Sequence, residues 1–175
     1  MSDNIYLGNV KVKNDEQEEY RQKLRSVVVR GEAWCLVVFG KVGNGKTYMA
    51  KVALATFNRI HGGGIYVTQP VLQDEFRAGS DSVNPFKRYA NAPMLVLDEL
   101  SDRGNDWTEF VKTSVESILV ERHRNNLPTV LIGNTDGQRL LAMFDIRIRD
   151  RLKEGLVMQM RGKSLRKEHG HGKED

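Results

Sequence analysis

The sequence has little cysteine and no long apolar run. Its single thiol, Cys35, excludes an internal disulfide and the cysteine clusters that bind zinc, and its apolar neighbours favour a buried structural role. Apolar stretches such as residues 35–39 and 94–97 are far shorter than the roughly twenty residues that cross a bilayer. The first ten residues lack the basic start and apolar stretch of a secretory signal. We therefore expect a cytoplasmic protein that does not contact a membrane.

The excess of positive charge is also small. The chain has 27 Lys and Arg against 23 Asp and Glu, a formal net charge of +4, which is too slight to establish a nucleic-acid partner. The distribution is uneven, because residues 15–19 hold four acids whereas residues 147–175 hold nine basic residues against five acids. This basic end is either a solvated face or a surface that binds phosphate.

Hydrophobic periodicity predicts strands that alternate with helices. The expected strands are 34–39, 65–68, 94–98, 129–133 and 156–160. The expected helices are 15–30, 46–60, two short pieces within 70–92 split at 79–85, then 106–124, 137–144 and 146–153. Crossovers of this kind imply a parallel sheet. We expect one three-layer α/β domain over residues 34–166, an arm and helix over 1–33, and a polar tail over 167–175.

Four apolar residues share one face of the first predicted helix: Tyr20, Leu24, Val27 and Val28. A stripe of this kind either covers the helix's own sheet or docks a partner protein. The sequence leaves both interpretations open.

A phosphate-binding loop lies between the first strand and the next helix. Residues 40–47 read Gly-Lys-Val-Gly-Asn-Gly-Lys-Thr, which fits the pattern of glycine, four residues, then Gly-Lys-Thr. The glycines let backbone NH groups curl around a phosphate, and the following helix adds its positive end. We expect the whole loop to bind ATP: Gly40, Lys41, Val42, Gly43, Asn44, Gly45, Lys46 and Thr47. Lys46 would reach the β- and γ-phosphates, and the Thr47 hydroxyl would bind Mg²⁺.

Three polar residues follow strands that end at the same edge of the sheet. Asp98 and Glu99 follow an apolar strand, and Asn134 follows the next one. Ligands bind at this edge in parallel sheets. We expect Asp98 to hold Mg²⁺ through water, Glu99 to polarise the attacking water, and Asn134 to orient that water against the γ-phosphate.

The arginines that could complete such a site lie elsewhere, in the box Arg-Ile-Arg-Asp-Arg-Leu at 147–152. This box, the closing Gly-Lys-Ser-Leu-Arg at 162–166 and the elements above together resemble the AAA+ ATPase module of DnaC/DnaI-type helicase loaders and the related IstB transposition ATPases. The resemblance covers residues 34–166, and its discriminating parts are the arginine box and the closing Ser-x-Arg. It implies a P-loop NTPase fold with a five-stranded parallel sheet in the order 5-1-4-3-2 and no C-terminal helical lid.

The resemblance also implies roles for particular residues. Asn134 would be the first sensor, and Arg151 an arginine finger that acts on the ATP of a neighbouring subunit. Arg147 and Arg166 would support the phosphate end or the interface. The protein would therefore form a homo-oligomer with ATP, as a ring or a spiral.

In loaders of this type, an insert between the second and third strands touches single-stranded DNA. Phe76 and Arg77 match the aromatic and basic element of that insert, and residues 86–89, Phe86, Lys87, Arg88 and Tyr89, form a second such cluster. Aromatic rings stack bases, and adjacent cations hold the backbone. The alternative is that Phe76 and Phe86 pack the insert onto the sheet.

The leading hypothesis is a replication protein that loads a replicative hexameric helicase onto single-stranded DNA and hydrolyses ATP at subunit interfaces. A compact chain of this kind suits a phage or mobile element. One alternative is an IstB-like ATPase that binds duplex DNA and activates a transposase. A small-molecule or nucleoside kinase is a third possibility, but the acidic pair at the end of a strand fits activation of water better.

Overall fold

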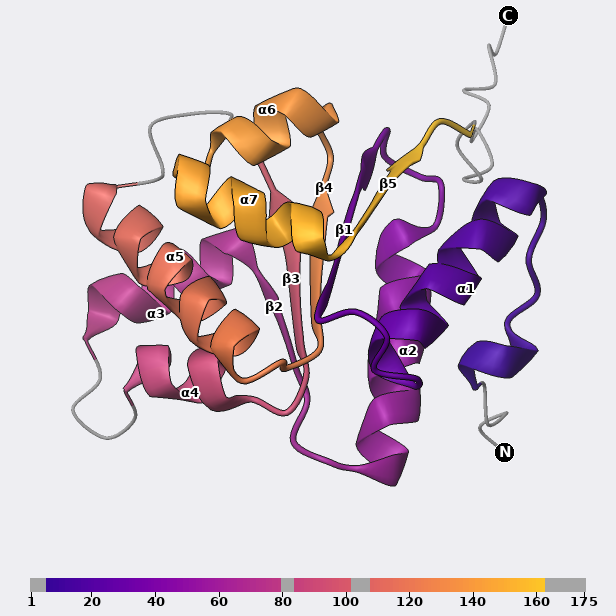
Figure 1. The fold of residues 1–175 in the computed structure, drawn as a ribbon, viewed down its shortest axis with the longest axis horizontal. Helices are drawn as coiled ribbons and strands as arrows, with labels where there is room; N and C mark the ends of the chain where they lie inside the picture. The colour runs from indigo at the N-terminus through magenta and orange to yellow at the C-terminus, as the bar shows by residue number, and fades with distance from the viewer. Residues whose placement is uncertain (1–5, 80–83, 102–107, 163–175) are drawn as a thin grey trace, which may run out of the picture.

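The computed structural model describes residues 6–79, 84–101 and 108–162, and it has a central sheet between two layers of helices (Figure 1). The five strands are β1 (Cys35–Gly40), β2 (Ile65–Thr68), β3 (Leu95–Leu100), β4 (Thr129–Gly133) and β5 (Leu156–Met160). All neighbouring strands are parallel, in the order β2-β3-β4-β1-β5. This is the predicted order counted from the opposite edge, so the predicted sheet is confirmed.

The helices divide unequally between the two faces of the sheet (Figure 1). One face carries α1 (Asp15–Val28), α2 (Lys46–Ile60) and the 3-10 turn η1 (Leu7–Asn9). The other carries α3 (Gln69–Ala78), α4 (Pro85–Asn91), α5 (Glu109–Arg124), α6 (Gly137–Ala142) and α7 (Ile146–Glu154). In the part of the chain that the structure describes, no helix follows β5 and none is long and apolar enough to cross a membrane.

Side chains on each strand alternate between two cores because successive strand residues point to opposite faces. On β1, Leu36 and Val38 pack with α1 and α2, whereas Val37 and Phe39 pack with the helices of the other face. Both faces are therefore buried, which explains why the strands read as continuous apolar runs. Cys35 is buried in this sheet as predicted, and burial raises the pKa of its thiol.

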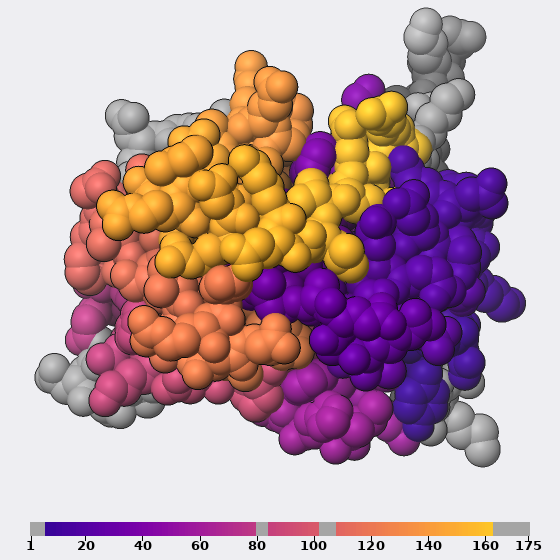
Figure 2. Space-filling model, viewed as in Figure 1, coloured from indigo at the N-terminus to yellow at the C-terminus, as the bar shows by residue number. Residues whose placement is uncertain are grey.

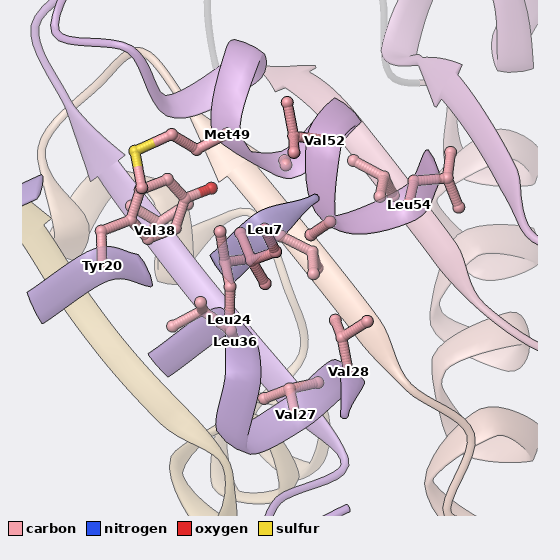
Figure 3. Close-up of a cluster of buried hydrophobic side chains, with 14 of the residues drawn as sticks. Leu7, Tyr20, Leu24, Val27, Val28, Leu36, Val38, Met49, Val52 and Leu54 are labelled. Carbon is pink, nitrogen blue, oxygen red and sulfur yellow. The ribbon is translucent and has the colours of Figure 1, made fainter. Parts of the chain in front are cut away.

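The apolar stripe of α1 packs on its own sheet. Figure 3 shows Tyr20, Leu24, Val27 and Val28 in the first core with Leu36 of β1. All four are buried, and burying an aliphatic side chain contributes about 1.5–3 kcal/mol to folding. The alternative that this stripe docks a partner protein is wrong.

Most predicted elements lie within two residues of the observed ones. The expected start of the fifth helix at Asp106 lies outside the described residues; α5 begins at Glu109, where the Thr108 hydroxyl accepts from Val111 N at 3.3 Å. β3 continues to Leu100 rather than ending at Asp98, because its register with β4 shifts between Leu97 and Leu100. The turn η1 was not expected from the sequence.

Candidate functional site

The loop between β1 and α2 depends on glycine at two kinds of position. Gly43 and Gly45 have φ angles of 92° and 94°, which lie in the left-handed region, and Gly45 caps α2. Gly40 has a φ angle of 137°, and a Cβ there would lie 2.0 Å from the carbonyl oxygen of Met160. The loop can therefore curl over the start of α2 while β1 stays paired with β5.

The ammonium group of Lys46 lies inside this loop. Its Nζ donates to the carbonyl oxygens of Gly40 at 2.8 Å and Lys41 at 2.7 Å, and to Asn44 Oδ1 at 2.9 Å. Burial lowers the pKa of Lys46 to about 8, and the negative charge of Asp98 acts in the opposite direction. At neutral pH most of the lysine is charged, so the loop presents a fixed cation to an anionic ligand.

The two acids at the end of β3 occupy different environments. Asp98 is 0% exposed; its Oδ2 accepts from the Tyr66 hydroxyl at 2.9 Å and its Oδ1 from Glu99 N at 2.6 Å. Burial and the charge of Asp98 raise the pKa of Tyr66, so that hydroxyl remains a donor. Glu99 is exposed and has a φ angle of 61°, at the point where the β3–β4 register shifts. Strained backbone of this kind at a bulge re-aims a side chain, and Leu100 then returns to the core.

One cavity of about 430 Å³ joins these elements. Its lining residues are Val42, Gly43, Asn44, Gly45, Lys46, Thr47, Tyr48, Lys51, Glu99 and Asn134. The structure thus brings together the loop, the exposed acid and the asparagine that follows β4. Sequence reasoning missed Lys51, whose Nζ lies 4.3 Å from the centre of the Tyr66 ring.

The donor set beside the loop fits Mg²⁺ held mainly by a phosphate. The residues that the structure describes contain no group of three or more His, Cys, Asp or Glu that could hold a metal alone. Mg²⁺ usually takes one or two protein oxygens, several waters and the oxygens of a bound phosphate. The Thr47 hydroxyl lines the cavity and fits this role. Asp98 is fully buried and does not line the cavity, so it fits only the water-mediated role predicted from the sequence.

A second cavity, of about 270 Å³, adjoins the first. Its lining residues are Val10, Lys11, Lys13, Gln17, Gly43, Gly45, Tyr48 and Met49. It shares Gly43, Gly45 and Tyr48 with the phosphate cavity. Sequence reasoning missed this cavity because the segment before α1 carries no motif and lies some thirty residues before the loop.

No family model and no curated protein matches the sequence. Among solved structures, AMPPCP-bound DnaA from Aquifex aeolicus superposes with a TM-score of 0.73 at 18% identity, over 91% of this chain and 50% of that chain. A DnaI structure has a TM-score of 0.73 at 23% identity, covering 92% and 90%. A DnaC helicase loader has a TM-score of 0.71 at 21% identity, covering 90% and 97%.

The chain has the AAA+ fold. It spans about half the length of the two AMPPCP-bound DnaA chains and most of the DnaI and DnaC chains. Identities of this size establish the fold alone.

The arginines of the predicted box lie away from the phosphate cavity. Arg147 and Arg151, on α7, line a groove of about 540 Å³ with residues of α4 and α5. Figure 2 shows α7 at the surface of the molecule, and the Arg147 side chain is 84% exposed, with its Nε 3.6 Å from Asp145 Oδ1. Among the described residues no arginine lines the phosphate cavity, and Arg166 lies outside them.

Two of the predicted DNA-binding aromatics, Phe76 and Phe86, line a second groove, of about 740 Å³, between α3, α4 and α5. The third, Tyr89, is fully buried and does not line it, so its prediction as a DNA contact is wrong. Phe76 and Phe86 are half-buried and pack against the second core, as the packing alternative requires, yet both still line the groove. Phe110, which sequence reasoning missed, is exposed and meets Phe76 edge to face at 6.1 Å between ring centres.

The basic residues of the insert differ in how they are held. Arg88 donates to both carboxylate oxygens of Glu75, at 3.0 and 2.9 Å, and so ties α4 to α3. Arg77 is exposed, with its Nη1 3.6 Å from Asp74 Oδ1, and Lys87 is exposed. Lys87 and Arg77 are therefore better placed than Arg88 to reach a phosphate backbone.

A buried arginine fixes the insert to the sheet. Arg122 of α5 is 0% exposed and donates to oxygens of residues in the α4–β3 connection and at the start of β4. Its partners within 2.8 Å are the carbonyls of Tyr89, Ala92 and Pro128 and the Thr129 hydroxyl. Burial lowers the pKa of Arg122 to about 10, so it remains charged at neutral pH.

Proposed function

We propose that this chain is an ATPase of DNA replication. The observation that carries the proposal is the single cavity that joins Lys46, Thr47, Glu99 and Asn134. A loop of this shape binds phosphate, and the exposed acid beside it adds the means to activate water.

Each residue of the site has a separate role in the proposed hydrolysis. The loop NH groups and Lys46 hold the β- and γ-phosphates, and Asn134 orients the attacking water. The oxygen of the water bonds to the γ-phosphorus, and the bond from that phosphorus to the bridging oxygen breaks. Glu99 accepts the proton that the water loses. Thr47 and Asp98 would hold Mg²⁺, which neutralises charge on the phosphates when it is bound.

The second cavity supplies a place for the adenine. It has an apolar wall formed by Val10 and Met49, and it continues from the loop through Gly43 and Tyr48. Pockets of this kind, mostly apolar with a few polar groups, bind flat heterocycles. The segment before α1 would then contact the adenine base, and the loop would bind the phosphates.

The arginines are proposed to act between subunits. No arginine lines the phosphate cavity in the described residues, whereas Arg151 and Arg147 lie at the surface on α7. In our proposal Arg151 reaches the ATP of a neighbouring copy, with Arg147 and Arg166 in support, in a ring or spiral. An arginine supplied in this way accelerates hydrolysis by about a thousandfold or more in other nucleotide hydrolases.

Helicase loading onto single-stranded DNA is the proposed cellular role. The similar DnaC structure is described as a helicase loader, and one similar DnaA structure is bound to AMPPCP and single-stranded DNA. In this chain, the groove with Phe76, Phe86 and Phe110 offers aromatic faces, and Lys87 and Arg77 lie on the same insert. This combination suits a single strand, in which bases are free to stack.

Co-purification with hexameric replicative helicases tests this role. The protein is incubated with each helicase and a non-hydrolysable ATP analogue, and Lys46→Ala serves as the control that cannot use the nucleotide. We expect a complex that forms with wild type only. A salt titration of binding to single-stranded and duplex DNA completes the test, because a preference for duplex with no helicase complex would favour the transposition ATPase instead.

A further inference from the structure

Asn44 is buried in a loop whose residues Lys41 and Val42 are exposed. It is itself 2% exposed. Its Oδ1 accepts from Lys46 Nζ at 2.9 Å, and its Nδ2 donates to the carbonyl oxygen of Met160 at 3.2 Å. The orientation of the amide is determined, because an ammonium group only donates and a carbonyl only accepts. Asn44 thus links the phosphate-binding lysine to the last residue of β5.

Helix α1 contacts the same loop at two points. Gln17 Nε2 donates to the carbonyl oxygen of Asn44 at 3.2 Å, and the Tyr20 hydroxyl donates to the carbonyl oxygen of Lys46 at 3.1 Å. Both side chains are buried. The backbone of the loop is therefore bonded to α1 on either side of Gly45.

The chain just after β5 returns to α1, which lies beside that strand (Figure 1). The Glu16 carboxylate accepts from the backbone NH groups of Arg161 and Gly162, the latter at 2.8 Å. Glu16 precedes Gln17, so the bonds close a ring that runs from α1 through the end of β5 and the loop and back to α1. We call this the loop ring; its members are Glu16, Gln17, Asn44, Met160, Arg161 and Gly162.

We propose that Asn44 is a positioning residue for the triphosphate: the loop ring holds the Lys46 ammonium where the phosphates bind, and Glu16 maintains the ring from α1. The inference rests on the proposed function for the identity of the ligand. It assigns α1 and the end of β5 a part in nucleotide binding, since movement of either changes the acceptor that holds Lys46. An ammonium group with one acceptor fewer, on a loop with one tether fewer, is less well fixed for the charge-assisted contacts that it makes with phosphate.

Substitution of Asn44 tests the role in phosphate binding. In Asn44→Leu, which keeps the branched side-chain shape but has no polar atoms, we expect ATP affinity to fall roughly tenfold or more, as expected for loss of a hydrogen bond to a charged group. AMP affinity should stay within about twofold, because Lys46 reaches phosphates that AMP lacks. Calorimetric titration measures both. An equal loss for ATP and AMP would indicate general damage and overturn the proposal.

Asn58→Leu is the matched control. The Asn58 amide also bridges backbone groups, accepting from Gly64 N at 2.7 Å and donating to the carbonyl oxygen of Gly64 at 3.2 Å, near the opposite end of α2. This variant loses a comparable pair of bonds far from the loop, and its ATP affinity should match that of wild type. A loss as large as that of Asn44→Leu would contradict a specific role for Asn44.

A double-mutant cycle tests whether the ring acts as a unit. Glu16→Ala should weaken ATP binding severalfold although Glu16 lies outside both nucleotide cavities. Combined with Asn44→Leu, it should add little, because the ring is already open. If the fold-losses in ATP affinity of the two single variants multiply in the double variant, the ring does not act as a unit.

Hydrogen exchange without nucleotide separates this inference from the proposed function. The amides of residues 43–47 should exchange faster in Glu16→Ala and Asn44→Leu than in wild type, with Asn58→Leu unchanged. If wild type binds no ATP while the loop loosens in these variants, the proposed function fails and the ring stands. If wild type binds ATP while neither variant changes exchange or affinity, the ring fails and the function stands.

Discussion

The phosphate cavity and the arginine groove differ in how their charged groups are held. In the cavity, Lys46 is 3% exposed with three acceptors, and at the end of β3 Asp98 is fully buried with two donors. In the groove, Arg147 is almost fully exposed, and the Arg151 guanidinium donates only to the Arg147 carbonyl, at 3.4 Å, among the bonds of the described residues. The first set is held by short hydrogen bonds within the fold, whereas the two arginines have only the longer contacts with Asp145 and Arg147 among the described residues.

This difference indicates where a complete ATP-hydrolysing site would form. Ordering a free arginine side chain costs conformational entropy, which a partner surface must offset. Under the proposed function, the cavity has the groups that bind ATP and activate water, and the groove has the guanidinium groups that stabilise the transition state. In our proposal two copies of the chain therefore contribute to each ATP site.

Removal of the buried cation should have the largest effect. In Lys46→Ala we expect ATP affinity to fall at least about a hundredfold, because the charge-assisted bonds to two phosphates are lost. Lys23→Ala, which removes a lysine on α1 that forms only a surface pair with Glu19, is the control for charge. Normal ATP affinity in Lys46→Ala would remove the phosphate-loop assignment.

Removal of the Arg151 guanidinium should leave ATP binding intact and slow turnover. In Arg151→Ala we expect phosphate release to fall by about a thousandfold, with ATP affinity within about threefold of wild type. Arg149→Ala is the control. Arg149 lies on the same helix, its Nε donates to the carbonyl oxygen of Phe144, and the variant should retain turnover. If both variants lost the same activity, α7 would matter for folding rather than for catalysis.

The re-aimed acid should matter for chemistry more than for binding. In Glu99→Gln we expect turnover to fall by about a hundredfold, because general bases contribute about that factor or more, while ATP binding persists. Glu32→Gln, at an exposed acid paired with Arg30, is the control. Steady-state phosphate release that matched wild type in Glu99→Gln would exclude Glu99 as the base.

The smallest effect is expected in the insert. Phe76→Ala should weaken binding of single-stranded DNA roughly tenfold, since stacking a base contributes about 1–3 kcal/mol. Val71→Ala, at an exposed apolar residue on the same helix, is the control. Fluorescence anisotropy with a labelled oligonucleotide measures both, and an unchanged affinity in Phe76→Ala would assign that ring to packing alone.

The sequence predicted the parts of the molecule that contiguous residues encode. The phosphate loop, the bounds of α2 and the meeting of Glu99 with Asn134 all follow from a local motif or from the rule that parallel strands end at one edge. The strand order came from the resemblance, and the structure confirms it.

The remaining features depend on packing between distant segments. Val10 and Gly43 both line the second cavity, and the buried Arg122 donates to the carbonyl oxygens of Tyr89 and Pro128, which are far apart in the sequence. An arginine in the last turn of a helix usually faces solvent, so no local pattern distinguishes this one. The bulge that exposes Glu99 likewise results from the register between β3 and β4, which the alternation of residues does not specify.

A mixing experiment tests the shared site most directly. Arg151→Ala retains the cavity and Glu99→Gln retains the groove, so each supplies what the other lacks. Phosphate release is measured as the two variants are combined at constant total protein, with ATP and single-stranded DNA present. We predict that the mixture hydrolyses ATP at a rate above the sum of the rates of the separate variants. A mixture that never exceeds that sum, at concentrations where wild type is active, would contradict it.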